Sequence, residues 1–179
     1  MTHVTEDADL IGAIDAVPTC ERCGSEKVVH DAWAAWNPGA GIWELRTAFD
    51  EAFCEACEES TRFVWLKEED LKRRRIAALN DALRRGDPGA EGMVVITEGV
   101  RALGPAFLEA AREAIRCFDG FGLDNDPHGE HDFGALEVCG EKLVFKIDAY
   151  DRRMRGASPD PSIASATRRV LTIMLASEY

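Results

Sequence analysis

Two Cys-x-x-Cys pairs near the N-terminus constrain the fold of this chain more than any other feature. Cys20 and Cys23 form the first pair, and Cys54 and Cys57 form the second. A tight turn at each pair can aim two thiolates at one cation, and two such turns complete the tetrahedral four-thiolate set that zinc accepts. A domain of about fifty residues buries too little apolar surface to be secure alone, so a structural metal would supply much of its stability. The pattern predicts one structural Zn²⁺ per chain.

Other interpretations of the cysteines stay open. The pairs could be unrelated, or one could be a redox motif, although the βαβ context that a redox Cys-x-x-Cys needs is not predicted here. Gly24 suits the turn after the first pair, but Glu58 stands where a second glycine would be expected. His30 is the obvious alternative ligand, yet four thiolates already fill the shell, so we expect it on a strand surface. Two further thiols, Cys117 and Cys139, are expected to be buried small apolar side chains.

The residues between and after the pairs predict an antiparallel ribbon. Apolar and polar residues alternate over 43–49, which is typical of a strand, and an earlier strand is expected around Val28–Trp36. Asn37–Gly41 supplies turn chemistry between these two strands. Arg62–Trp65 would be the third strand. We therefore expect a three-stranded zinc ribbon.

The ribbon is rich in tryptophan for its size. The four indole side chains are Trp33, Trp36, Trp43 and Trp65. We expect at least two of them to fill the small ribbon core, because large rings fill a small interior efficiently. An exposed tryptophan could instead bind a partner.

A helix should follow the ribbon. Residues 68–85 contain no Gly or Pro, and their leucines and alanines share one face. The opposite face carries the basic residues Arg73, Arg74, Arg84 and Arg85, which form the best candidate surface for nucleic acid. The alternative is a solvated face of ion pairs, because Asp81 lies four residues before Arg85.

The remaining residues predict a C-terminal α+β domain. Met93–Thr97 is predicted to be a buried strand, and Pro105 opens a helix. Leu136–Cys139 and Leu143–Asp148 flank Gly140-Glu141, which predicts a hairpin with a type II′ turn. An apolar stripe over Ala164–Glu178 predicts a final helix. The order of elements predicts a small antiparallel sheet with helices on one face.

The whole chain is therefore expected to be an α+β protein with four parts. These are a flexible N-terminal tail over residues 1–16, a zinc ribbon over 17–66, a linking helix and turn over 67–89, and the α+β domain over 90–179.

The segment before the predicted hairpin is unusually rich in ionisable groups. Asp124–Phe133 holds four carboxylates and two histidines, and Asp148 could close on the same region. The candidate site residues are His128, Glu130, His131, Asp132 and Asp148. Such a group could hold a divalent metal or run general acid–base catalysis. The alternative is a structured turn, since Asp, Asn, Pro and Gly are turn formers.

Charge limits the classes of partner. The chain has 33 acidic and 21 basic residues, a net charge of −12, and residues 1–66 hold thirteen acidic and four basic residues, a balance of −9. This disfavours binding of nucleic acid over the whole surface and attraction to anionic lipid, and it favours a basic protein partner. No secretory signal or membrane-spanning apolar window is evident, so we expect a cytoplasmic protein with reduced thiols.

The C-terminal hundred residues resemble a bacterial family known only as a domain of unknown function. The segments that carry the resemblance are Leu79–Leu83, Ile96–Gly99, Asn125–Gly134, Lys146–Asp151, Arg169–Ala176 and Glu178-Tyr179. Ala149 departs from an aromatic position of the family, so it is given no role. The N-terminal segment separately looks like a bacterial zinc ribbon. The resemblance implies a soluble bacterial protein, often carried on mobile elements, and makes the Asn125–Gly134 loop the best site candidate.

These observations lead to three functional hypotheses. The first is a zinc-binding accessory protein that acts by protein–protein contact, for example an acidic inhibitor that imitates nucleic-acid phosphates on a host defence or DNA-binding protein. The alternative is a metal-assisted hydrolase or nuclease that uses the Asp124–Asp132 loop. The third is nucleic-acid binding through the ribbon and the helix that carries Arg73 to Arg85, which the overall charge disfavours.

Overall fold

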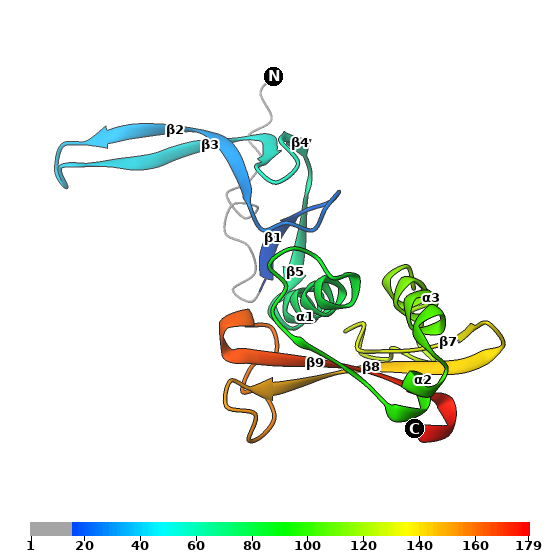
Figure 1. The fold of residues 1–179 in the computed structure, drawn as a ribbon. Helices are drawn as coiled ribbons and strands as arrows, with labels where there is room; N and C mark the ends of the chain where they lie inside the picture. Colours follow the sequence, from blue (N-terminus) through cyan, green and yellow to red (C-terminus); the bar gives the residue numbers. More distant parts are fainter. Residues whose placement is uncertain (1–15) are drawn as a thin grey trace. The chain divides into compact units, whose positions relative to one another are not determined.

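The computed structural model describes residues 16–179 (Figure 1), which divide into two compact units. The division falls between Leu71 and Lys72, inside helix α1 (Glu68–Arg85), which has the bounds expected from the sequence. The predicted tail over residues 1–16 lies outside the described residues except for Ala16, which begins strand β1.

Unit 1 contains two antiparallel sheets. Its strands are β1 (Ala16–Cys20), β2 (Val28–Asn37), β3 (Ile42–Cys54), β4 (Glu59–Thr61) and β5 (Phe63–Lys67). The sheet of order β2-β3-β4 is the predicted three-stranded ribbon, but its third strand is β4. The expected third strand, Arg62–Trp65, was wrong in its pairing, because most of it belongs to β5, which pairs with β1. The short segment after the second cysteine turn is thus split between two sheets.

The β2–β3 hairpin turns where the sequence predicts. The side-chain oxygen of Asn37 accepts the backbone N–H groups of Gly39 and Ala40 at 2.9 and 3.1 Å. Gly41 has φ of +66° and donates its N–H to the Asn37 carbonyl. An Asn side chain that caps its own turn, followed by a residue in the left-handed region, closes the hairpin without strain.

The distal part of this hairpin has no core. From Val28 to Glu51 no residue is buried, and Figure 1 shows this segment as a long two-stranded ribbon, here named the arm. The expectation that two tryptophans fill a ribbon core was wrong. Trp33, Trp36 and Trp43 of the arm are 69%, 50% and 69% exposed, and Trp65 of β5 is 42% exposed. The hairpin is too narrow to enclose large rings.

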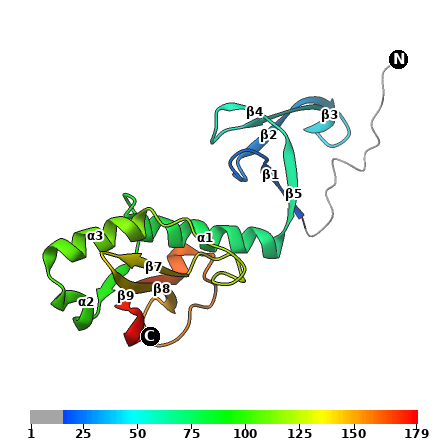
Figure 2. The same ribbon diagram turned by 90° about the vertical axis from the view of Figure 1, so that its right-hand side faces the viewer.

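Unit 2 is a four-stranded sheet with helices on one face (Figure 2). The strands are β6 (Met93–Ile96), β7 (Phe133–Val138), β8 (Glu141–Asp151) and β9 (Thr167–Leu175), and the order is β6-β9-β8-β7. The helices are α1, α2 (Glu98–Ala102) and α3 (Pro105–Arg116), with short 3-10 turns η2 (Ala164–Ala166) and η3 (Ala176–Glu178). All pairs are antiparallel except β6 with β9. No helix within residues 16–179 is long and apolar enough to cross a membrane.

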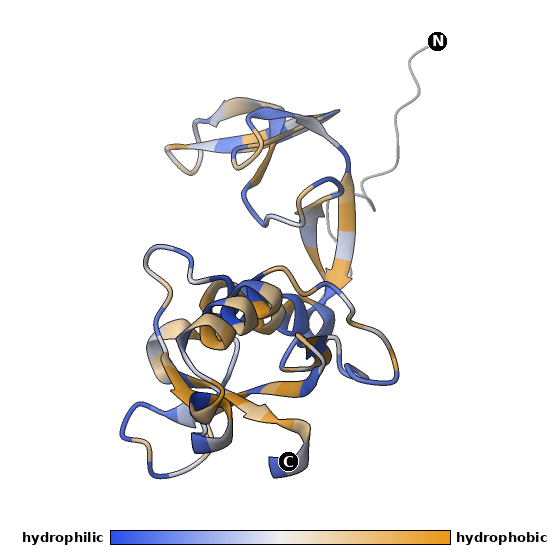
Figure 3. Ribbon diagram, turned by 45° about the vertical axis from the view of Figure 1, so that its right-hand side comes forward, coloured by the Kyte–Doolittle hydropathy of each residue, from blue (hydrophilic) through white to orange (hydrophobic). Residues whose placement is uncertain are grey.

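The core of unit 2 lies between the sheet and the helices. Figure 3 shows apolar residues concentrated on β8 and β9. The buried cluster comprises Leu83, Val100, Phe107, Ala111, Ile115, Val138, Leu143, Phe145, Ile147, Leu171 and Ile173. Burial of each large side chain contributes roughly 1.5–3 kcal/mol. Gly134 of β7 makes room for Phe145, because a Cβ at that position would lie 2.6 Å from Phe145 Cζ.

The predicted C-terminal helix over Ala164–Glu178 was wrong, because most of it is strand β9. Thr167, Val170, Leu171 and Met174 are spaced as on a helix face, which produced the error. β9 lies between β6 and β8, and it is buried on both faces. A central strand is a continuous apolar run, which periodicity cannot distinguish from a buried helix.

The β7–β8 hairpin is confirmed, but its turn lies one residue earlier than expected. Val138 pairs with Glu141, so the two-residue loop is Cys139-Gly140. Both loop residues have positive φ, 51° and 87°, which is the geometry of a type I′ turn and not of the predicted II′ turn. Cys139 is consequently exposed, and so is Cys117, whose thiol lies 3.3 Å from the Glu113 carboxylate. The expectation that both are buried was wrong.

Candidate metal centre

The four cysteines of the two pairs converge on one point in unit 1. Cys20 ends β1 and Cys54 ends β3, and both are buried, whereas Cys23 and Cys57 lie in the turns that follow. Their four sulfur atoms all lie within 4.8 Å of one another. The arrangement could hold a metal ion.

The two cysteine turns have the same backbone geometry. The N–H of Gly24 donates to the carbonyl of Cys20 at 2.8 Å, and the N–H of Glu58 donates to the carbonyl of Cys54 at the same distance. Both donors lie in the left-handed region, with φ of 71° and 56°. Each turn therefore points its two thiols to the same side. In the second turn the left-handed position is held by Glu58, which is strained there, whereas a glycine would not be.

Hydrogen bonds divide the thiols into unlike groups. Thr61 of β4 hydrogen-bonds to Cys20 Sγ at 3.1 Å and lowers the pKa of Cys20 to about 6. The hydrogen bond from Cys23, followed by burial, raises the pKa of Cys57 to about 12. Cys23 Sγ also lies 3.7 Å from Cys54 Sγ. A bound cation would require all four sulfurs as thiolates, so metal binding must release protons.

The chemistry of the donor set favours a structural ion. Four thiolates suit soft or borderline cations and leave no open coordination position for a substrate. His30 is not part of the group. It lies exposed on β2, as expected, with its ring 3.3 Å from the Glu51 carbonyl oxygen and packed edge-on against Phe63. Within residues 16–179, the four cysteines are the only such group that could hold a metal.

The segment Asp124–Asp132 before β7, here named the acidic loop, is held in shape by hydrogen bonds to Asp126. This carboxylate is buried and accepts the backbone N–H groups of Glu130 and His131 at 2.8 and 3.2 Å. The loop is further attached to α1, because the Asn80 side chain donates to the Glu130 carbonyl at 2.8 Å. The buried guanidinium of Arg169 on β9 donates to the same Asn80 side chain. Asp126, Asn80 and Arg169 were not among the predicted site residues.

His131 is the candidate residue with the most contacts. Its Nδ1 lies 3.2 Å from Asp81 Oδ2 of α1, and its Nε2 lies 3.8 Å from Asp126 Oδ2. The ring stacks on Phe121, with the centroids 4.0 Å apart and the planes 3° from parallel. An imidazole oriented by a carboxylate can transfer protons.

The other predicted site residues lie close enough to interact electrostatically, since the charges of His128 and Asp148 both affect the pKa of Asp132, but they form no metal-binding cluster within residues 16–179. His128 is exposed, and Asp148 forms an ion pair with Lys146 at 2.9 Å. Burial is the main cause that raises the pKa of both Glu130 and Asp132, and nearby carboxylates add to it. The hydrolase or nuclease hypothesis stays a prediction, with the His131 contacts as its support.

The basic residues of α1 do not form one face. Arg84, expected on the solvent side, is buried, and its guanidinium donates to the carbonyls of Ile115 and Arg116 at the end of α3. It also pairs with Asp81 and lies over the Phe121 ring. An arginine that satisfies the last carbonyls of a neighbouring helix is stabilising. Its Nε remains buried without a hydrogen-bond partner.

The remaining basic residues of the predicted nucleic-acid surface have separate surroundings. Arg85 is exposed and pairs with Asp81 at 3.1 Å, as the four-residue spacing predicts. Arg73 is also exposed, and its side chain lies beside the backbone of Gly129 in the acidic loop. Arg74 is exposed one residue further along the helix. Any basic surface on α1 is thus smaller than predicted.

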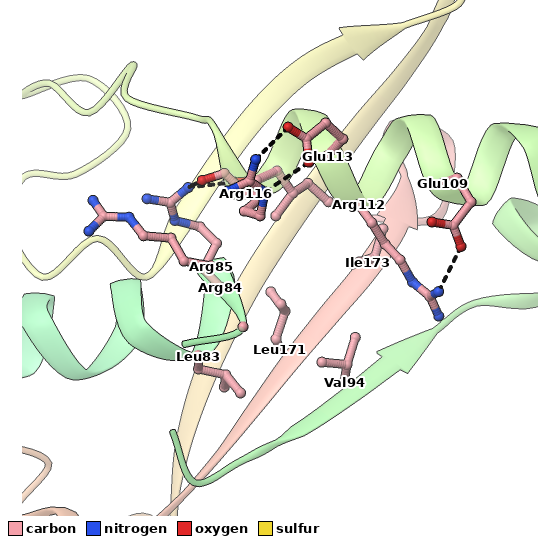
Figure 4. A pocket seen from close by; sticks show the side chains of 12 residues that line it. Leu83, Arg84, Arg85, Val94, Glu109, Arg112, Glu113, Arg116, Leu171 and Ile173 are labelled. Carbon is pink, nitrogen blue, oxygen red and sulfur yellow. Dashed lines mark hydrogen bonds and ion pairs between the residues drawn. The ribbon is translucent and has the colours of Figure 1, made fainter. Parts of the chain in front are cut away.

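Arg84 and Arg85 instead contribute to a groove between α1, α3 and the β6–β9 edge (Figure 4). Its volume is about 370 Å³, and Leu83, Val94, Ile115, Leu171 and Ile173 supply its apolar lining. Arg112 and Arg116 of α3 lie on its rim and pair with Glu109 and Glu113. The Arg116 guanidinium holds the pKa of Glu113 at about 2. The sequence analysis did not identify these two arginines of α3. Each follows a glutamate by three residues, and this spacing could have predicted the two ion pairs.

Comparison with known proteins places unit 2, in part, among domains of unknown function. Residues 96–178 match the model of a family described as "Protein of unknown function (DUF3768)". The match includes the acidic loop and β7 to β9, and it leaves the cysteine ribbon and α1 outside. Searches of curated proteins and of solved structures found no match to the chain. The C-terminal part of this chain is therefore similar to a family of unknown function, as its motifs predicted.

Proposed function

We propose that this chain is a zinc-stabilised protein-interaction module that acts through the arm and the acidic surface of unit 1. The observation that carries the proposal is the arm itself, a hairpin of residues 28–51 without one buried residue. Large exposed apolar patches on soluble proteins mark sites of protein or ligand contact.

Zinc is the metal we expect at the four cysteines. Tetrahedral all-sulfur coordination is the usual structural site of this ion. Cys20 ends β1 of one sheet and Cys54 ends β3 of the other, so one ion would join both sheets. The metal would thereby hold the base of the arm, whose own interior is too small to do so.

The aromatic side chains of the arm are pre-arranged for contact. Trp36 and Trp43 pack edge to face with centroids 5.7 Å apart, and Trp33 and Phe49 do the same at 5.1 Å. Rings that already hold one another lose little conformational freedom on binding, and aromatic side chains dominate the energy of protein interfaces.

The base of the arm and the second cysteine turn together supply an acidic surface. Asp50, Glu51, Glu55, Glu58 and Glu59 are exposed around the second cysteine turn. This concentration of carboxylates favours a basic protein partner by steering and by charge complementarity. A DNA-binding or host-defence protein, inhibited by carboxylates that imitate phosphates, fits this chemistry. The family resemblance adds a bacterial protein carried on a mobile element as the expected setting, and the lack of an evident secretory signal leads us to expect it in the cytoplasm.

Site-specific photocrosslinking tests the proposal. The variant Trp33→p-benzoylphenylalanine, produced in cells and irradiated, should form a crosslink between the arm and a bound protein. The same variant that also carries Cys54→Ser should form no such crosslink. The matched control is Leu123→p-benzoylphenylalanine, because Leu123 is an apolar residue of unit 2 that is 87% exposed. Equal crosslinking at both positions, or none at Trp33, would contradict the proposal. The acidic surface is tested separately, since a basic partner captured in low salt should be released in high salt.

A further inference from the structure

We propose that the groove between α1, α3 and the β6–β9 edge of unit 2 binds a small aliphatic monocarboxylate. The groove is separate from the arm and from the acidic surface, so this inference goes beyond the proposed function. Its positive charge, its aliphatic wall and its volume all fit such a ligand.

The end of α1 carries more positive charge at the groove than its carboxylate neutralises. Arg84 and Arg85 both line the groove, and both pair with the single carboxylate of Asp81, at 2.8 and 3.1 Å. The same carboxylate also lies 3.2 Å from His131 Nδ1. Two guanidinium groups therefore share one negative charge, which leaves one positive charge without a counter-ion.

The groove is thus positive on a strongly acidic chain. Four arginines and two glutamates line it, and Asp81 is a third carboxylate beside it, so the net charge there is +1. The two arginines of α3 pair one to one with glutamates, so the excess lies at the end of α1. The whole chain carries −12. Most of the surface would repel an anion, whereas this groove would attract a ligand with one negative charge.

The buried guanidinium of Arg84 is also incompletely satisfied. It donates to the carbonyls of Ile115 and Arg116 and to the Asp81 carboxylate. Among the buried side-chain nitrogen and oxygen atoms of residues 16–179, its Nε alone has no hydrogen-bond partner. A carboxylate bound at the adjoining Arg85 would add a negative charge beside this donor, in surroundings where a low dielectric constant strengthens the attraction.

The apolar part of the groove is aliphatic and partly open to solvent. Val94 of the edge strand β6 is 47% exposed, and it pairs with Leu171 of β9 in the floor of the groove. Leu83, Leu171 and Val94 lie together below Arg84 and Arg85 in the view of Figure 4. None of the lining residues is aromatic, so an alkyl chain would find contacts here and an aromatic ligand would find no ring to stack on.

The size of the groove suits a short chain. Its volume is about 370 Å³, at the lower end of the range for small-molecule sites. At about 30 Å³ for each water, this is room for roughly twelve water molecules, and octanoate with its roughly ten non-hydrogen atoms would displace most of them. The space beside Gly86, at the end of α1, is open, because a Cβ at that position would have no contact within 4 Å.

Methyl NMR of the full-length, zinc-loaded protein, titrated with octanoate, tests the proposal. The methyl groups of Val94, Leu171 and Ile173 should shift and saturate with a Kd below about 1 mM. Octylammonium has the same chain with the opposite charge, and acetate has the charge without the chain. Each should bind at least about tenfold more weakly than octanoate. Equal binding of octanoate and octylammonium, or octanoate shifts that spare these methyl groups, would overturn the inference.

Substitutions separate the charge from the apolar contact. Arg85→Gln should weaken octanoate binding about tenfold, whereas Arg101→Gln, at an exposed arginine of α2 outside the groove, should not. Val94→Thr should weaken it roughly threefold. Val95→Thr is the matched control, because Val95 is 40% exposed on the opposite face of the same strand.

Equal effects within either pair of variants would also overturn the inference. The arm contributes no residue to the groove, so this result would leave the proposed function standing. Conversely, the absence of a crosslink at Trp33 would contradict the proposed function without affecting octanoate binding.

Discussion

Glu58 occupies in the second cysteine turn the position that Gly24 occupies in the first. Each backbone N–H donates at 2.8 Å to the carbonyl of the first cysteine of its pair, and each residue has positive φ. The two halves of the candidate metal centre are thus equivalent in backbone but not in side chain. The second half carries the conformational cost of a non-glycine residue in the left-handed region.

Glu58→Gly should therefore tighten metal binding. Relief of the left-handed strain at this turn contributes about 1 kcal/mol, which corresponds to roughly fivefold higher affinity. Competition with a chromophoric chelator measures the change. Glu55→Gly is the control, since this exposed residue is not in the left-handed region, and it should bring no gain. Equal gains at both positions would point to lost negative charge as the cause.

Cys54→Ser should remove the metal and unfold unit 1. Cys54 is fully buried and ends β3, so its substitution opens the coordination shell. Unit 1 then loses the stabilisation by metal binding, which is on the order of 10–16 kcal/mol. Unit 2 has its own core and should keep its amide dispersion in NMR spectra. Elemental analysis should find one zinc in the parent chain and in Cys117→Ser, an exposed control, and none in Cys54→Ser. Retention of metal would refute the four-cysteine site.

His131→Ala should destabilise unit 2 by about 1–3 kcal/mol, because it deletes the contact with Asp81 and the stack on Phe121. Urea denaturation followed by circular dichroism measures the loss. His128→Ala removes an exposed imidazole three residues earlier and should cost less than about 0.5 kcal/mol. Equal effects of the two substitutions would show that the position of His131 between α1 and its loop is not stabilising.

Asp132→Asn should stabilise unit 2 at pH 7 more than at pH 4. Burial raises the pKa of Asp132, so the folded chain binds a proton more readily than the unfolded chain. Stability from this group is complete below the unfolded pKa and is lost as pH rises through the folded pKa. The amide variant escapes that loss, which we expect to be roughly 0.5 kcal/mol after solvent screening. Unfolding of the parent chain and of the variant at the two pH values measures it, and an equal gain at both would contradict the prediction.

Local sequence signals predicted the elements whose stability is local. The cysteine spacing predicted the convergence of four sulfurs, and the absence of Gly and Pro over Glu68–Arg85 predicted α1. The Asn37–Gly41 turn also followed from residue types, because side-chain hydrogen bonds and left-handed φ values act within a few residues. The helix and the hairpin turn depend on interactions within a few residues, whereas the four sulfurs converge from two pairs 31 residues apart, each of which forms its own local turn.

The tertiary structure decided which side chains are covered. β9 is a strand because β6 and β8 pair with it, and Arg84 is buried because the end of α3 needs donors for its carbonyls. The tryptophans of the arm are exposed because, within the described residues of unit 1, nothing packs on the distal part of β2 and β3 that carries them. The sequence by itself determined the cysteine turns, helices α1 and α3, and the acidic balance. Burial depends on contacts between segments distant in the chain, so only the folded structure showed the buried Arg84, the environment of His131 and the exposed arm.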